Sequence, residues 1–289
     1  MMDISIIGAG RLGASLGYAL SKIGYGLKAL SCKSLSSAKE SQKIIGNGKP
    51  LTDNIQTARR GDLVILCVPD GIIEKVAREL AASSIEWSKK FVFHCSGLLS
   101  AEILKPLKTK GAITASFHPV QSFAQKRPDI KQFKGIYFGL EGCLEALSLG
   151  KKLVRNLGGH FFILQAEDKP LYHAACSFAS NFFVVLLDTA TSLLSRIGFK
   201  DEEASRILLP LVQGTLHNVK KFNIDCSLTG PVIRGDHKSI EKHLMSLQNL
   251  PLYHEVYSKL ATQALEIAKR EKKLSPQKIK ALRNLLEEK

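Results

Sequence analysis

The sequence predicts two domains: an α/β domain with a doubly wound, mainly parallel sheet over residues 1–165, and an all-helical domain over residues 166–289. Up to about residue 165, short apolar runs alternate with amphipathic helical patterns. Such repeated strand–helix–strand units are typical of parallel sheets. No convincing strand pattern follows residue 165, and 289 residues are enough for two hydrophobic cores.

In the first domain, the predicted strands are short apolar runs, and we expect at least the first five to be parallel because helical patterns connect several of them. The strands are predicted at residues 4–7, 27–31, 63–68, 91–94, 113–117, 136–140 and 160–164, and helices at 12–23, 72–81 and 144–156.

The second domain begins with Asp168-Lys169-Pro170, which resembles a helix cap with proline in the first turn. The helical pattern that follows continues to about residue 196, longer than most globular helices. Further helices are predicted at residues 202–219, 239–247, 252–272 and 276–286, the last opened by Ser275-Pro276 as N-cap and first residue.

Composition favours an ordinary globular protein, with 45% hydrophobic and 23% charged residues. The longest apolar run, residues 182–187, is far shorter than a membrane span and ends at Asp188. The N-terminus enters a strand without the features of a signal peptide, so we expect a cytoplasmic protein with no membrane partner. The six cysteines are dispersed without a C-x-x-C pair, which argues against disulfides and against a metal site.

The net charge of +15 raises the alternative of a nucleic-acid-binding protein. The densest lysine cluster lies between Lys269 and Lys280, where glutamates interrupt or flank it. No helix-turn-helix, zinc finger or aromatic stacking motif accompanies these lysines. We therefore expect a solvated helix face that binds no nucleic acid, and a positive field that attracts a small anionic substrate.

A glycine-rich motif follows the first predicted strand and opens a helix. In this setting G-x-G-x-x-G gives a tight turn, close approach of the backbone to a pyrophosphate and close helix–strand packing. The free N–H groups at the helix N-terminus favour the phosphates. The motif predicts a Rossmann-type dinucleotide site formed by Gly8, Ala9, Gly10, Arg11, Leu12 and Gly13. A glycine turn without a ligand is the alternative.

The end of the second strand indicates which dinucleotide binds. NAD sites usually carry Asp or Glu there, to accept hydrogen bonds from the ribose 2′-hydroxyl. This chain has Ser31, Cys32, Lys33 and Ser34 instead. Two hydroxyls and an ammonium suit the 2′-phosphate of NADP(H), although Lys33 could also be a solvated side chain. We predict NADP(H) as the cofactor.

The reactive crevice of an open parallel sheet lies beyond the carboxyl ends of its strands. Three segments lie there: Val68-Pro69-Asp70, His94-Cys95-Ser96-Gly97 and Phe117-His118-Pro119. Val68 and Pro69 are predicted to contact the cofactor, and Ser96 and His118 to polarise and protonate a carbonyl. His94 and His118 could instead be bonded to backbone.

Polar residues on the long helix provide a second set of candidates. His173, Ser177, Ser180 and Asn181 have the spacing of one helix face on an otherwise apolar helix, so they face either internal partners or a wet cleft. In the turn near residue 230, Arg234 could grip a carboxylate, or pair with Asp236 at the next helix.

These motifs resemble a Rossmann-like bacterial family with a helical C-terminal domain of unknown function. The matching segments are Gly8–Gly13, Val68-Pro69-Asp70, His94-x-Ser96-Gly97, His118-Pro119, Tyr172-His173-Ala174-Ala175, Ser180-Asn181 and Thr229-Gly230-Pro231-x-x-Arg234-Gly235-Asp236. The resemblance implies membership of the wider group with 6-phosphogluconate dehydrogenase-like, pyrroline-carboxylate reductase and ketopantoate reductase proteins. It also implies NADP-dependent hydride transfer to a small carbonyl or imine.

Two comparisons within that group suggest roles for single residues. His118-Pro119 is similar to the His-Pro of prephenate dehydrogenases, whose histidine is catalytic. Ketopantoate reductases carry a catalytic lysine about two turns before an asparagine, and aligning on Asn181 puts His173 in that place.

The sequence thus predicts an NADPH-dependent oxidoreductase that reduces a small carbonyl compound, a 2-oxo acid above all, held between the two domains. The predicted catalytic residues are Ser96, His118, His173 and Asn181, and the predicted substrate-binding residues are Ser180 and Arg234. The alternatives are an imine reductase of the pyrroline-carboxylate reductase type and an NADP-binding regulatory protein without catalysis. A homodimer through the long helix is a further expectation.

Overall fold

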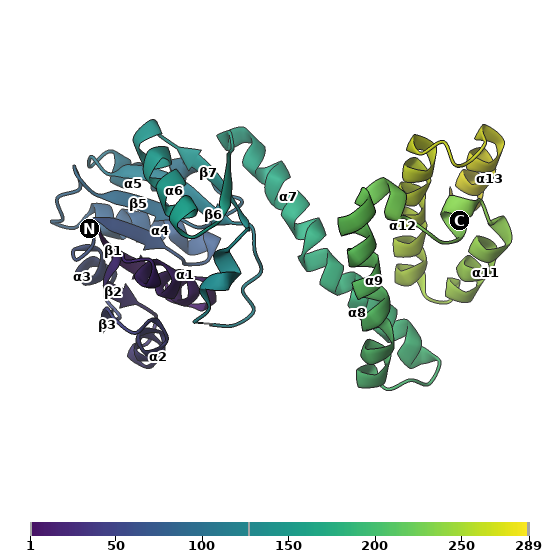
Figure 1. The fold of residues 1–289 in the computed structure, drawn as a ribbon, viewed down its shortest axis with the longest axis horizontal. Helices are drawn as coiled ribbons and strands as arrows, with labels where there is room; N and C mark the ends of the chain where they lie inside the picture. Colours follow the sequence, from purple (N-terminus) through teal and green to yellow (C-terminus); the bar gives the residue numbers. More distant parts are fainter. Residues whose placement is uncertain (1, 127, 288–289) are drawn as a thin grey trace. The chain divides into compact units, whose positions relative to one another are not determined.

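The computed structural model describes residues 2–126 and 128–287, and it confirms an α/β domain followed by helices (Figure 1). Within the described residues the sheet has eight strands in the spatial order β3-β2-β1-β4-β5-β6-β7-β8. Their bounds are β1 Asp3–Ile7, β2 Gly26–Ser31, β3 Lys49–Leu51, β4 Leu63–Leu66, β5 Phe91–His94, β6 Ile113–Pro119, β7 Tyr137–Gly142 and β8 His160–Ile163.

The first six strands pair in parallel, as predicted for the five of them that the sequence identified. The sequence prediction missed β3, a three-residue edge strand that contains Pro50. Proline lacks an N–H for the ladder and is tolerated at a sheet edge. Strand β7 runs antiparallel to β6, and β8 is parallel to β7.

Helices cover both faces of the sheet, because alternate side chains of each strand point to opposite faces. Ile4 and Ile6 of β1 join one buried apolar cluster, and Ile7 joins the other. The helices of this part are α1 Arg11–Lys22, α2 Leu35–Ile45, α3 Asn54–Ala58, α4 Asp70–Ala81, α5 Lys105–Lys108 and α6 Leu144–Asn156.

The remaining helices largely follow the sequence prediction. They are α7 Lys169–Ala179, α8 Asn181–Arg196, α9 Asp201–Ser227, α10 Pro231–Arg234, α11 His237–Leu247, α12 Pro251–Arg270 and α13 Pro276–Glu287. The pattern predicted one helix up to residue 196, whereas Ser180 leaves helical geometry (φ −125°, ψ −70°) between α7 and α8.

The chain forms two compact units, Met1–Asn181 and Phe182–Lys289. The sequence placed the boundary between residues 165 and 166, so α7 was expected in the helical part. In the structure α7 is in the first unit, because Lys169 is fully buried there and bonded to Ser96 and Ser116. A separate buried cluster from α10 to α13, including Ile240 and Leu265, forms the core of the second unit.

The apolar helix Ala166–Arg196 is long and apolar enough, by length and composition only, to cross a membrane, and none of its most apolar window is buried within the chain. The longest continuous apolar run within it, residues 182–187, is short because spaced polar residues interrupt the apolar sequence. A helix that packs against another protein chain meets the same criteria.

Candidate functional site

The glycine-rich turn between β1 and α1 has the geometry of a phosphate-binding loop. Gly8 has φ +87°, a conformation that favours glycine, and its N–H donates to Ser31 O at 3.0 Å. A Cβ on Gly13 would lie 2.4 Å from Gly8 O, whereas a Cβ on Gly10 would meet nothing within 4 Å. Gly13 is therefore required by close packing, and the open space beside Gly10 fits a pyrophosphate.

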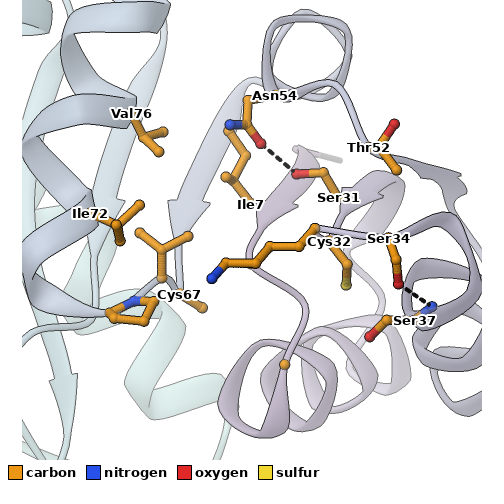
Figure 2. A pocket seen from close by; sticks show the side chains of 15 residues that line it. Ile7, Ser31, Cys32, Ser34, Ser37, Thr52, Asn54, Cys67, Ile72 and Val76 are labelled. Carbon is orange, nitrogen blue, oxygen red and sulfur yellow. Dashed lines mark hydrogen bonds between the residues drawn. The ribbon is translucent and has the colours of Figure 1, made fainter.

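This turn opens onto a cavity of about 580 Å³, the cofactor cavity, at the carboxyl ends of β1, β2 and β4 (Figure 2). Its lining includes seven of the residues predicted to bind the cofactor: Gly8, Gly10, Ser31, Lys33, Ser34, Val68 and Pro69. The first N–H groups of α1 have no carbonyl one turn earlier, so they are available to an anion.

Other predicted cofactor residues support the turn. Ala9 is fully buried, and its carbonyl accepts a hydrogen bond from Ser41 Oγ at 2.6 Å. Arg11 and Leu12 occupy the first turn of α1 and are not part of the cavity lining. Thus the glycines and the end of β2 face the cavity, while Ala9 fixes the loop to α2.

Some polar groups at the end of β2 make hydrogen bonds within the protein, and others face the cavity. Ser31 is 1% exposed and donates to Asn54 Oδ1 at 3.0 Å, so its hydroxyl is already engaged. Ser34 is the N-cap of α2, and its Oγ accepts from Ser37 N at 3.3 Å. Figure 2 shows the Ser34 and Ser37 side chains next to each other. Lys33 also lines the cavity, so one cavity contains a cation, hydroxyls and a helix N-terminus.

A second cavity of about 730 Å³ lies beyond β6 and against α7, and we name it the catalytic cavity because three of the four predicted catalytic residues, His118, His173 and Asn181, line it. The four polar residues expected to share one helix face all line this cavity, although Ser180 is the non-helical residue between α7 and α8 and Asn181 is the first residue of α8. The cavity lining includes those four, His173, Ser177, Ser180 and Asn181, together with His118, Tyr172, Gln121 and Ser122.

His118 and His173 are brought together at the edge of this cavity. Their ring centroids are 6.5 Å apart, and both rings lie against the backbone of Gly97. A Cβ on Gly97 would come within 2.8 Å of His173 Cδ2 and 2.9 Å of His118 Nε2. Gly97 thus allows two imidazoles from different elements to approach the end of β5.

Tyr172 holds the His118 ring. Its hydroxyl lies 2.6 Å from His118 Nδ1, and its own ring packs edge-on against the imidazole. Burial raises the pKa of Tyr172, so the group is a neutral phenol at physiological pH. Burial, the charge of Lys169 and then that of His173 lower the pKa of His118 to about 4. His118 is therefore a neutral imidazole near pH 7.

Lys169, at the start of α7, places a positive charge beneath these rings. It is fully buried, and its Nζ donates to Ser116 Oγ at 2.7 Å and to Ser96 O at 3.2 Å. No carboxylate of the described chain lies within ion-pair distance of it; Glu141 and Asp70 act on it from farther away. Burial lowers the pKa of this ammonium.

Two strand-end residues point inward. Ser96 is 5% exposed, and its Oγ accepts from Leu98 N at 3.1 Å and Leu99 N at 3.0 Å. It is not part of the catalytic-cavity lining, so it holds the loop that carries Gly97. His94 Nε2 lies 3.1 Å from Ser100 O, its Nδ1 accepts from Ser96 N, and burial lowers its pKa to about 3. For His94, the alternative of a backbone-bonded residue is confirmed.

Arg234 lies in the second unit, at the end of α10, and its side chain is exposed. Asp236 caps α11 through hydrogen bonds from Ser239 N at 3.1 Å and Ser239 Oγ at 2.7 Å. Of the two roles considered for this turn, the capping role of Asp236 is thus present, while the role of Arg234 in substrate binding stays a prediction.

Sequence reasoning missed three residues of these sites as functional groups. Lys169 was interpreted as part of a helix cap, Tyr172 only as a family motif, and Asn54 not at all. The motif Tyr172-His173 could have indicated that both side chains are functional, since adjacent residues of a helix point in different directions and can contact different groups. No local pattern marks Lys169, whose burial depends on β5 and β6.

Family models match most of the chain in two parts: residues 1–119 match a Rossmann-like domain, and residues 136–264 match DUF2520, a domain of unknown function. No curated protein matches the sequence.

Among solved structures, a Bacteroides fragilis protein described as an NADP oxidoreductase is 23% identical, with a TM-score of 0.76. The match covers 91% of this chain and 97% of the Bacteroides fragilis chain. A Thermotoga maritima protein is 28% identical with TM-score 0.72, covering 93% and 99%. Pyrroline carboxylate reductase of Plasmodium falciparum with NADP bound is 13% identical with TM-score 0.60, covering 98% of both chains. These likenesses establish the fold.

Proposed function

Because the chain pairs a Rossmann-like domain with a DUF2520 domain, we propose that it is an NADPH-dependent reductase of a small carbonyl compound, with 2-oxo acids as the preferred class. The observation that carries this proposal is the group formed by His118, Tyr172 and His173 at the catalytic cavity, above the buried charge of Lys169.

The cofactor assignment rests on the glycine turn and on the end of β2. Gly8 and Gly10 would face the pyrophosphate, Gly13 would allow the close packing behind them, and Lys33 with Ser34 would hold the 2′-phosphate. NADPH would supply the hydride. The NADP bound to the Plasmodium falciparum relative supports the same choice.

The charge of Lys169 favours a carbonyl over an imine. Reduction of a carbonyl places developing negative charge on oxygen, which a fixed positive charge and hydrogen-bond donors stabilise. An iminium substrate is itself positive and would be repelled. His118, fixed by Tyr172, and His173 are positioned to donate to the substrate oxygen, and Asn181 with Ser180 to orient the substrate. Ser96 acts through the Gly97 loop.

An imine reductase is the second candidate function, favoured by the pyrroline carboxylate reductase among the similar structures. The experiment is to follow NADPH absorbance with purified protein and a panel of 2-oxo acids, aldehydes and cyclic imines. Oxidation with 2-oxo acids alone supports the proposal, and oxidation with cyclic imines alone replaces it by the second candidate. Tight NADPH binding without turnover across the panel would instead indicate a regulatory protein.

We also propose that the protein acts as a homodimer in the cytoplasm. The apolar faces of α8 and α9 expose large side chains, namely Val184, Val185, Leu186, Leu209, Leu211 and Leu216. Exposed patches of this kind usually mark contacts with another protein. The cysteines are all free, as a reducing compartment keeps them.

Light scattering and vesicle flotation test the dimer. A dimeric mass that Val184→Glu converts to a monomer is expected, whereas flotation of the wild-type protein with lipid would indicate a membrane surface instead.

A further inference from the structure

Lys126 reaches from the loop after β6 to helix α2. Its Nζ lies 2.6 Å from Glu40 Oε2 and 3.3 Å from Ser37 Oγ, although these residues are more than 80 positions apart in the chain. The Lys126 side chain is only 17% exposed, whereas that of Glu40 is 63% exposed. An exposed ion pair contributes about 0–1 kcal/mol. Because the Lys126 side chain is largely covered, its position is fixed by the surrounding residues and not by this ion pair alone.

The contact with Ser37 connects Lys126 to the cofactor cavity. Ser37 is part of the lining of that cavity, in the first turn of α2 beside Ser34 (Figure 2). Lys33 lines the same region from the end of β2. Lys126 thus lies beside a serine of the cavity lining, near the N-terminus of an eleven-residue helix, and Lys33 supplies a second ammonium group to the same cavity.

We propose that Lys126 binds the 2′-phosphate of NADPH together with Lys33 and the α2 serines, and so determines the preference for NADPH over NADH. The inference rests on the proposed function, since it assumes a dinucleotide in the cofactor cavity. A phosphate monoester carries a charge of about −1.5 to −2 near pH 7, so two lysines balance it where one does not.

Glu40 allows the role of Lys126 to be distinguished from a general attraction between positive charge and phosphate. Its carboxylate holds Lys126 in the free protein and repels a phosphate at the same place. Removing Lys126 therefore deletes an attraction and also exposes a repulsion. Removing the charge of Glu40 alone frees Lys126 for the phosphate.

The loop also connects the two cavities. Gln121 and Ser122, a few residues before Lys126, line the catalytic cavity beside His118. When Lys126 binds the 2′-phosphate, this loop is held at both ends. Because Glu40 already holds Lys126 in the free protein, NADPH exchanges one partner of this loop for another, whereas NADH leaves the Glu40 contact in place.

The first experiment is equilibrium binding of NADPH, NADH, 2′,5′-ADP and 5′-AMP to wild type, Lys126→Ala, Glu40→Gln and Lys131→Ala. We expect Lys126→Ala to weaken NADPH and 2′,5′-ADP at least about tenfold, the effect of one charge-assisted contact, while NADH and 5′-AMP change less than about twofold. Glu40→Gln should strengthen NADPH binding. Lys131, an exposed lysine in the short 3-10 helix Ile130–Phe133 that follows, is the matched control and should change neither.

The second experiment uses trypsin on the wild-type protein. NADPH should protect the peptide bond after Lys126 from cleavage, and NADH should not. Equal protection by both, or by neither, contradicts the proposal.

The outcomes separate this inference from the proposed function. A wild-type protein that binds neither dinucleotide, or both equally, overturns the cofactor assignment and this inference together. A wild-type preference for NADPH that Lys126→Ala leaves intact overturns only the role of Lys126. Equal loss of NADPH and NADH in a Lys126→Ala protein with unchanged thermal unfolding does the same.

Discussion

Two alanine substitutions in the glycine turn should separate folding from cofactor binding. A Cβ on Gly10 meets nothing within 4 Å, so Gly10→Ala should change the free energy of unfolding by less than about 0.5 kcal/mol. The same methyl group would project into the space assigned to the pyrophosphate. A Cβ on Gly13 would lie 2.4 Å from Gly8 O and 3.1 Å from Cys67 Cβ. Gly13→Ala should therefore destabilise the first unit by about 1–3 kcal/mol even without a ligand.

Thermal unfolding with and without NADPH measures both effects. At a hundredfold excess over Kd, a ligand stabilises the folded protein by about 2.7 kcal/mol. For a unit of this size that is a rise in Tm of about 5–11 °C. Wild type should show the rise, and Gly10→Ala should have the wild-type Tm without it. A Gly10→Ala protein with a full NADPH-dependent rise would refute the assignment of this turn to the pyrophosphate, whatever Gly13→Ala does.

Four further predictions follow from the same sites. Lys33→Ala should reduce a preference for NADPH over NADH that is at least about tenfold in wild type, as measured by fluorescence titration; equal affinities in the parent protein would exclude NADP as the favoured cofactor. In an active preparation, His173→Ala should lower turnover at least about a hundredfold with little change in NADPH affinity, and His118→Ala should do the same; normal activity of either variant would remove that residue from the mechanism. The folded-state pKa of His118, about 4, lies below its unfolded value near 6.5, so His118 alone should cost the folded state about 3 kcal/mol as pH drops through that window. His94, whose pKa is also lowered, adds to the total fall, so the difference between wild type and His118→Asn in urea unfolding at several pH values measures the share of His118. No duplex should bind beyond weak, salt-sensitive attraction, and submicromolar affinity at physiological salt would show that the Lys269–Lys280 lysines were misinterpreted.

The glycine motif shows how far local pattern can go. Each glycine was assigned a task from its position between a strand and a helix, and the structure gives Gly8 its left-handed backbone and Gly13 its close contact. Both requirements concern residues a few positions apart, so they can be predicted from the motif itself. The spacing of His173 and Ser177 was equally informative, since both lie on α7 and line one cavity, whereas Asn181 reaches the same cavity from α8, across the break at Ser180.

Ser96 and Ser31 show where that reasoning fails. Both stand at strand ends, as expected, yet their hydroxyls bond to Leu98 and Leu99 and to Asn54. A strand end fixes the place of a residue but not which partner its side chain finds. That choice depends on loops whose course is set by packing.

Local sequence patterns predict the doubly wound sheet, the nucleotide-binding turn and the polar positions of α7, because each follows from the spacing of neighbouring residues. Packing between distant segments places α7 in the same unit as the sheet, buries Lys169 close enough to lower the pKa of His118, and brings Lys126 to Ser37 and Glu40. Those contacts join segments tens of residues apart. They arise because crossover helices bring the carboxyl ends of parallel strands to one edge, where charge and burial are set by whichever side chains arrive there.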